Sequence, residues 1–271
     1  MGPYRKSRLS PRLRRHARLV VGGLSLLCVL LLWQVATAWF GWIRPLFLAS
    51  PATLWEAFAT SLREPYGGAT LPEHILVSLN EVLVGFVGGV AVGIPLGVSM
   101  GWSPTVGRMM SPFFNTVRQI PPLAWVPLAV VWFGIGFAPK AFVIFIAAVV
   151  PSTINAFIGV RMVDRDLLNA ARVFGAGGWR LVRQAVVPSA APLMFTGMRL
   201  SLQISWTTVV AAELLASSAG LGFMMVNASR NLQPEFIMLS MAMIGILGAL
   251  MTQGLERLQH RLISWQEPPR E

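Results

Sequence analysis

Long apolar runs alternate with short polar segments along the whole chain. The runs are continuous and about 20 residues long, the length that an α-helix needs to cross the hydrocarbon core of a bilayer. A transmembrane β-barrel would instead show apolar and polar residues in alternation. We identify six helical spans, at about residues 19–40, 76–100, 109–133, 140–160, 191–214 and 237–259. The pattern therefore predicts an all-α, polytopic membrane protein.

The composition agrees with this class. Hydrophobic residues make up 55% of the chain, charged residues only 12%, and the mean hydropathy is +0.63, whereas soluble domains carry about 25% charged residues. The net charge of +11 raises the question of nucleic-acid binding. No basic patch is interleaved with exposed aromatic residues, so we expect no nucleic-acid partner. Cys28 is the lone cysteine, which rules out an intrachain disulfide.

Lysine and arginine residues are distributed unevenly between the two sides of these spans. Sixteen fall on one side and four on the other, and short cytoplasmic loops are the ones enriched in these residues. Both termini are therefore expected in the cytoplasm. The predicted parts are a basic N-terminal segment (1–18), a first transmembrane helix (19–43), a periplasmic segment with a short helix (44–75), a five-helix core (76–262) and a cytoplasmic tail (263–271).

The first span also fits the crude pattern of a signal peptide. It follows a basic segment and ends at the small residues Ala36, Thr37 and Ala38. The aromatic residues Trp39, Phe40 and Trp42 come directly afterwards, as expected at the interfacial end of a retained helix. We therefore expect the helix to be retained; cleavage would leave five spans and an outer N-terminus.

The segment 44–75 carries a helix-start signal. Pro51 follows Ser50, and proline is favoured at the first position of a helix. Leu54, Ala57 and Phe58 then repeat at helical spacing. We expect a short helix along the outer membrane face.

A polar segment at 161–188 interrupts the apolar runs on the cytoplasmic side. In its first half, apolar and small residues recur at helical spacing and form one broad face of a helix. Its second half, "WRLVRQAVV", predicts another helix. Asp164 or Asp166 could cap the first helix, glycines from Gly175 onward would end it, and Pro188 would mark the turn into the fifth span. The residues of that first face are Val163, Leu167, Ala170, Ala171 and Phe174. Periodicity alone fits equally a docking element and a simple connection.

The spacing in this segment resembles the cytoplasmic "EAA" loop of binding-protein-dependent ABC importer permeases. The matching residues are Asn169, Ala170, Ala171, Gly175, Ala185, Val187 and Pro188. In that family the loop seats in a groove of the ATP-binding subunit. The resemblance implies a packing role for the small residues here, whereas Asn169 replaces the usual glutamate and leaves its docking chemistry open.

Further motifs extend the resemblance over about residues 45–265. The stretches "VGIPLGVSMGWSPTV", "RQIPPLAWVPLAVVWFGIG" and "WTTVVAAELLASSAGLGFM" resemble the nitrate, sulfonate and taurine permeases, and most of all the taurine and alkanesulfonate importers. This implies the type I importer permease fold, with six transmembrane helices and a coupling helix. It also implies the partners: two ATP-binding subunits that hold ATP and Mg, a substrate-binding protein, a second copy of this chain and the lipid of a bacterial inner membrane.

No catalytic apparatus is visible in the chain itself. A phosphate-binding P-loop needs a G-x-x-x-x-G-K-[ST] pattern, and neither Lys6 nor Lys140 stands in one. The three histidines, His16, His74 and His260, lack metal-ligand spacing. We therefore expect no enzyme, no metal and no cofactor in this chain.

Polar residues at membrane depth are costly and mark candidate functional positions. The double proline at Pro121 and Pro122 should break the third helix and free backbone groups that only protein or a water-filled cavity can receive. The candidates for the pathway or its gate are Glu81, Arg118, Gln119, Pro121, Pro122, Trp125, Gln203, Trp206 and Glu213. Each has a plain structural alternative: headgroup-level placement for Glu81, bracing for Arg118 and packing for the tryptophans. For Glu213 we favour a structural or gating role, since a carboxylate repels an anion.

These observations predict the transmembrane subunit of an ATP-driven importer for a small organic anion, with taurine or another sulfonate favoured. Nitrate and aromatic or carboxylate anions stay open as substrates. The alternative class is a secondary transporter that uses Glu81 and Glu213 as ion relays.

Overall fold

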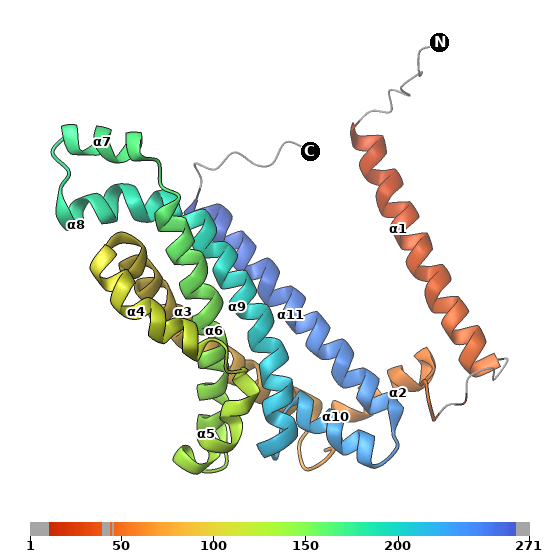
Figure 1. Cartoon of the computed structure of the whole chain (residues 1–271). Coiled ribbons are helices and arrows are strands. Elements are labelled where there is room, and N and C mark those ends of the chain that lie inside the picture. The colour runs from red at the N-terminus through yellow and green to blue at the C-terminus, as the bar shows by residue number, and fades with distance from the viewer. Residues whose placement is uncertain (1–10, 40–43, 45, 264–271) are drawn as a thin grey trace, which may run out of the picture.

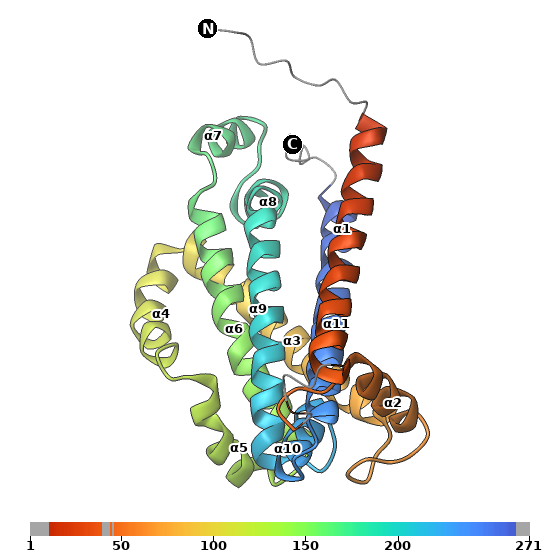
Figure 2. The ribbon, with the colours of Figure 1, turned by 90° about the vertical axis from the view of Figure 1, so that its right-hand side faces the viewer.

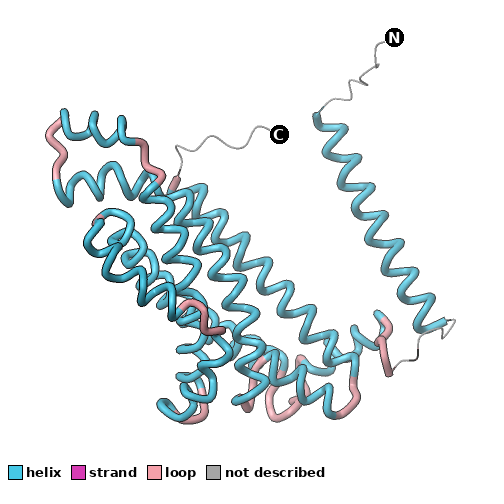
Figure 3. Tube along the Cα trace, viewed as in Figure 1, coloured by secondary structure: helices cyan, strands magenta, loops and turns pink. Residues whose placement is uncertain are grey.

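The computed structural model describes residues 11–39, 44 and 46–263, and within these residues the fold is built from helices (Figures 1 and 3). The elements are α1 (Pro11–Gln34), η1 (Val35–Trp39), α2 (Pro51–Ser61), α3 (Leu71–Trp102), α4 (Pro104–Val117), η2 (Pro122–Trp125), α5 (Val126–Phe133), α6 (Phe137–Arg161), α7 (Arg165–Val173), α8 (Gly178–Leu181), η3 (Val182–Val186), α9 (Val187–Ala216), α10 (Leu221–Arg230) and α11 (Pro234–Leu262). Four stretches are long and apolar enough to cross a membrane: 21–38, 71–102, 137–161 and 234–262. These findings confirm the all-α membrane class.

The centre of the bundle is the pairing of α3 with α6, and glycine makes it close. Five glycines of α3 repeat every fourth residue: Gly85, Gly89, Gly93, Gly97 and Gly101. A Cβ on Gly89 would lie 2.5 Å from the Cβ of Ala148 and 2.9 Å from the carbonyl oxygen of Phe145. Small residues in such a row let helix backbones approach within a membrane. The sequence of α3 thus fixes where α6 lies.

Helix α9 packs against both α6 and α3 and completes the core. Its buried side chains Leu202, Trp206 and Val209 join Val82 and Ile144 in one apolar cluster. Ser201 on α9 also donates a hydrogen bond to the carbonyl of Ala148 at 2.8 Å. The three helices α3, α6 and α9 therefore form one packed unit.

The short helix of the outer segment begins as predicted. Ser50 is the N-cap of α2, its side chain accepts a hydrogen bond from the backbone N–H of Thr53 at 3.2 Å, and Pro51 is the first residue. Helix α3 begins at Leu71, five residues before the predicted boundary, because Thr70 and Glu73 form a capping box. Helix α2 lies at the same end of the molecule as α5 and α10, opposite α7 and α8 (Figures 1 and 2).

The predicted third span, 109–133, is broken at the double proline, as expected. Helix α4 ends at Val117, and the chain turns through Arg118 to Pro121 before η2 and α5. Proline lacks a backbone donor and its ring clashes with the preceding turn, so Pro121 and Pro122 stop the helix. The third apolar run is therefore two short helices joined at a bend.

The turn predicted at Pro188 is present as a bend: α8 and α9 run in clearly different directions (Figures 1 and 2), although the helical structure continues between them. The chain runs helically from Gly178 to Ala216 through α8, η3 and α9, with Pro188 in the first turn of α9. The wider π-turn of η3 precedes the proline, and the Val187 N–H bonds the carbonyl of Val182. A proline next to a π-turn can be accommodated without breaking the helix, since the local backbone is already adjusted around it.

The helix of α1 continues without interruption into η1 across the small residues Ala36 to Ala38. Near its end, Trp33 donates a hydrogen bond from Nε1 to the carbonyl of Ala49 at 3.0 Å. Phe40 and Trp42 lie outside the described residues, as do most of the basic N-terminal segment and nearly all of the C-terminal tail.

Candidate functional site: a buried polar cluster and an exposed end helix

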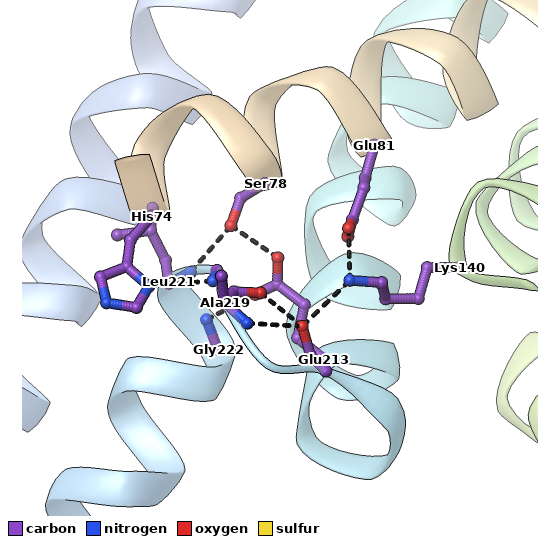
Figure 4. A network of polar contacts seen from close by, with 10 residues as sticks. His74, Ser78, Glu81, Lys140, Glu213, Ala219, Leu221 and Gly222 are labelled. Atoms are coloured by element: carbon purple, nitrogen blue, oxygen red, sulfur yellow. Dashed lines mark hydrogen bonds and ion pairs between the residues drawn. The ribbon is translucent and has the colours of Figure 1, made fainter. Parts of the chain in front are cut away.

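Three charged side chains from three different helices meet inside the bundle (Figure 4). Glu81 comes from α3, Lys140 from α6 and Glu213 from α9, and they are only 1%, 5% and 1% exposed. Lys140 forms an ion pair with Glu81 and donates a hydrogen bond from Nζ to Ser217 Oγ at 3.0 Å. Breaking such a buried pair would leave an uncompensated charge, so the partners depend on one another.

Glu213 lies beside the pair and organises the start of α10. Its Oε1 accepts a hydrogen bond from Ser78 at 2.6 Å, and its Oε2 accepts one from the Gly222 N–H at 2.6 Å. Ser78 in turn accepts from the Leu221 N–H at 2.8 Å. A carboxylate at a helix N-terminus satisfies free N–H groups and complements the helix dipole.

His74 completes this set from the first turn of α3. The Gly220 N–H donates to His74 Nδ1 at 2.9 Å, so the ring hydrogen lies on Nε2, which donates to the carbonyl of Tyr66 at 2.9 Å. Gly220 has φ +128°, and a Cβ on Gly222 would lie 2.9 Å from Glu213 Oε2. Only glycine fits at positions 220 and 222, which explains the two glycines in the "SAGLG" sequence of this loop.

A cavity of about 250 Å³ adjoins the cluster. Its lining includes Glu81, Lys140, Asn80, Ser217 and Ser218. The Oε2 atom of Glu81 is buried and has no hydrogen-bond partner among the described residues. Buried polar atoms normally find partners, so this oxygen marks unused binding capacity.

The other pathway candidates lie in separate places. Arg118 and Gln119 are exposed at the end of α4, where Arg118 borders a cavity of about 310 Å³. Trp125 packs against the small apolar cluster of α5, α6 and α9. Gln203 and Trp206 face a groove of about 490 Å³ between α9 and α11. Glu81 and Glu213 are thus the two charged candidates that the structure brings together from different helices.

The predicted docking helix lies at the opposite end of the bundle (Figure 1). Asp164 is the N-cap of α7, and its side chain accepts a hydrogen bond from the Asp166 N–H at 2.9 Å. Gly175 follows the helix with φ +84°. Phe174 is 91% exposed, and Leu167 and Ala170 are exposed as well. An amphipathic helix with an uncovered apolar side is an arrangement that a partner groove can accept.

Two details of this end element bear on docking. Asn169, which stands at the glutamate position of the loop motif, accepts a hydrogen bond from Arg172 Nη1 at 3.2 Å. Ala171 and Phe174 line a groove of about 360 Å³ together with Arg180 and Ala185. The small Ala171 side chain keeps this groove open between α7 and the start of the long helix.

Sequence reasoning missed three members of the polar cluster: His74, Ser78 and Lys140. Lys140 was counted only as a charge on the outer side, because a lysine near the end of an apolar helix commonly extends to the membrane surface. Ser78 and His74 had no sequence signal beyond lying at i, i+4 on the same helix as Glu81.

Comparisons with known proteins agree on one class. The family described as "Binding-protein-dependent transport system inner membrane component" matches residues 89–265. The taurine transport system permease protein TauC of Escherichia coli is 38% identical over 93% of this chain and 91% of its own length. The nitrate import permease protein NrtB of Synechocystis is 31% identical over 94% of this chain and 90% of its own length.

Solved structures show the same fold at low sequence identity. A chain of the MetNI methionine ABC transporter in an inward-facing conformation aligns with TM-score 0.56 and 19% identity, over 68% of this chain and 95% of that one. A chain of an amino acid ABC transporter aligns with TM-score 0.51 and 16% identity, over 71% and 92%. These likenesses extend to the fold alone.

Proposed function

Because this chain belongs to the family of binding-protein-dependent transport system inner membrane components, we propose that it is the membrane subunit of an ATP-driven importer of small sulfonates. The observation that carries this is the 38% identity to a taurine permease across nearly the whole of both chains. The nitrate permease relative extends the likeness to another small anion. Family membership favours this reading over an ion-gradient-driven transporter.

Helix α7 is the element through which ATP hydrolysis would act. The chain lacks a P-loop, so ATP and Mg are held by partner subunits, one for each permease copy. The apolar side of α7, with Leu167 and Phe174 uncovered, seats in the ATPase, and α8 connects it to the long helix α9. Closure of the ATPases then shifts the balance between two states of the bundle by differential contacts.

The remaining assembly follows from the same function. Two copies of the permease enclose the pathway, with both termini and α7 in the cytoplasm of a bacterial inner membrane. A periplasmic binding protein delivers the sulfonate to the end that carries α2 and α10. Positive residues are concentrated on the α7 side, in keeping with this orientation.

Docking is tested by Ala171→Glu in the complex expressed with its ATPase. The added carboxylate is bulky and charged and would disturb the apolar contact between α7 and the ATPase, which costs several kcal/mol. Co-purified ATPase should fall by more than about tenfold, since each 1.4 kcal/mol is a factor of ten. The matched control is Ala59→Glu on the exposed side of α2 at the other end of the molecule.

Transport is tested in proteoliposomes that contain the complex, ATP and the loaded binding protein. We expect ATP-dependent uptake of labelled taurine in the wild type and none in Ala171→Glu; Ala59→Glu serves as the control for ATPase binding alone. Uptake that persists without ATP would overturn the importer assignment. Normal ATPase binding by Ala171→Glu would overturn the docking role of α7.

A further inference from the structure

The polar cluster has one hydrogen-bond acceptor and one donor that are not used within the described residues. Glu81 Oε2 is buried without a partner among the described residues. Lys140 Nζ uses two of its three hydrogens, on Glu81 and on Ser217. Both oxygens of Glu213, in contrast, are engaged by Ser78 and Gly222. The free acceptor and the free donor therefore belong to the Glu81–Lys140 pair.

Both members of the pair border the same cavity. The space of about 250 Å³ also has the Asn80 amide and the hydroxyls of Ser217 and Ser218 in its lining. A ligand there meets a carboxylate oxygen on one side and an ammonium with hydroxyl groups on the other. Charge-assisted hydrogen bonds to such groups are about twice as strong as neutral ones.

We propose that this cavity is a binding subsite for an aminosulfonate of the taurine type. The ligand's ammonium donates to Glu81 Oε2, and its sulfonate accepts from Lys140 Nζ and from the hydroxyl of Ser218; the Ser217 hydroxyl already donates to the carbonyl of Ala219. This inference rests on the proposed sulfonate import and names the residues that distinguish substrates within it.

The charge of the cluster favours a ligand with both signs over a simple anion. Glu81 and Glu213 are carboxylates and Lys140 is the one cation among the cluster residues of Figure 4. A simple anion would add a negative charge to a buried site that already has two carboxylates. An aminosulfonate adds no net charge, and each of its ends meets an opposite charge.

When the subsite is empty, Glu81 and Lys140 neutralise each other through their ion pair. Glu81 projects from α3 and Lys140 from α6, so each is held by its own helix. Each charge thus keeps a partner before the ligand arrives, which avoids an isolated charge in the bundle. The subsite is therefore ready without a large rearrangement.

The test measures binding of taurine and of ethanesulfonate, which carries the same sulfonate but no amine. The permease–ATPase complex in nanodiscs is titrated with each compound by saturation-transfer NMR. In the wild type, taurine should bind at least about tenfold more tightly, as expected for one buried charge-assisted hydrogen bond. In Glu81→Gln, taurine should weaken by about that factor, whereas ethanesulfonate should bind as tightly or more tightly, because one carboxylate is gone and Lys140 has lost its ion-pair partner.

Two further variants protect the result from misfolding. Glu56→Gln makes the same chemical change on the exposed surface of α2 and should leave both affinities unchanged. The paired variant Glu81→Gln/Lys140→Met removes the ion pair without leaving an isolated charge, and it should weaken taurine and abolish the preference for it. Monodisperse elution and ATPase binding verify the fold of each variant.

Equal wild-type affinities for the two compounds would overturn the subsite, as would a parallel loss of both in Glu81→Gln. Absence of taurine binding would overturn it too. The importer assignment is tested separately, by ATPase docking and by ATP-dependent uptake of taurine.

Discussion

Replacing Gly89 by alanine should loosen the central helix pair of the bundle. The added Cβ would lie 2.5 Å from the Cβ of Ala148 and 2.9 Å from the backbone oxygen of Phe145. Carbon atoms in contact prefer about 3.5–4.0 Å, so α3 and α6 must separate by about 1 Å at this point. The backbone oxygen cannot move aside by a rotamer change, which makes the separation unavoidable.

The magnitude follows from two opposing effects. Overpacking a close contact costs about 1–3 kcal/mol, and a gap of this size forfeits part of the contacts made by the neighbouring glycines of α3. Alanine gains about 1 kcal/mol over glycine in a helix. We expect a net loss of about 1–2 kcal/mol, which lowers the thermal midpoint by several degrees, at about 2–4 °C per kcal/mol for a chain near this size.

The assay is the thermal midpoint of detergent-purified protein, followed by fluorescence-detected size exclusion. Gly254→Ala on α11 is the matched control, since a Cβ there meets nothing within 4 Å. It should leave the midpoint unchanged or raise it slightly. Equal midpoints for the two variants would refute the close packing inferred for α3 and α6.

Three further substitutions test separate features. Ser78→Ala leaves the Leu221 N–H and one Glu213 oxygen unpaired in the interior and should cost about 2–4 kcal/mol. The thermal midpoint measures this loss, with the exposed Ser99→Ala as control; equal midpoints for the two variants would contradict the role of Ser78. Asp164→Ala removes the cap of α7 and should weaken that helix by about 1 kcal/mol, seen as reduced ATPase binding; unchanged binding would show that the cap does not matter for docking. Glu256→Ala breaks only a half-exposed ion pair with Arg199 at 3.8 Å. It should cost less than about 1 kcal/mol and therefore leave the thermal midpoint nearly unchanged; a large drop in the midpoint would contradict this.

The features predicted correctly from the sequence are those that local chemistry determines. Ser50 and Pro51 start α2 because capping depends on neighbours within a few residues. The break at Pro121 follows from the missing backbone donor in the same way. The bend at Pro188 has a comparable origin, since a proline and the π-turn before it are both local causes of helix bending.

The polar cluster could be predicted only in part. Glu81 and Glu213 stood out as charges within apolar runs, yet nothing in the sequence placed them together. Their meeting depends on how α3, α6 and α9 pack, and Lys140 joins them from a third helix. Residues that interact across such separations are found by tertiary packing and not by periodicity.

The length of α9, which follows the bend after α8, has a mechanical consequence. The helix has 30 residues and is about 45 Å long at 1.5 Å per residue. A stiff rod of that length works as a lever: a tilt of about 10° displaces its far end by about 8 Å. The near end of this lever adjoins α8, and its far end carries Glu213 and the loop held by Lys140. A small rotation at the α8 end is thereby amplified into a displacement of several ångströms at the end that carries the polar cluster.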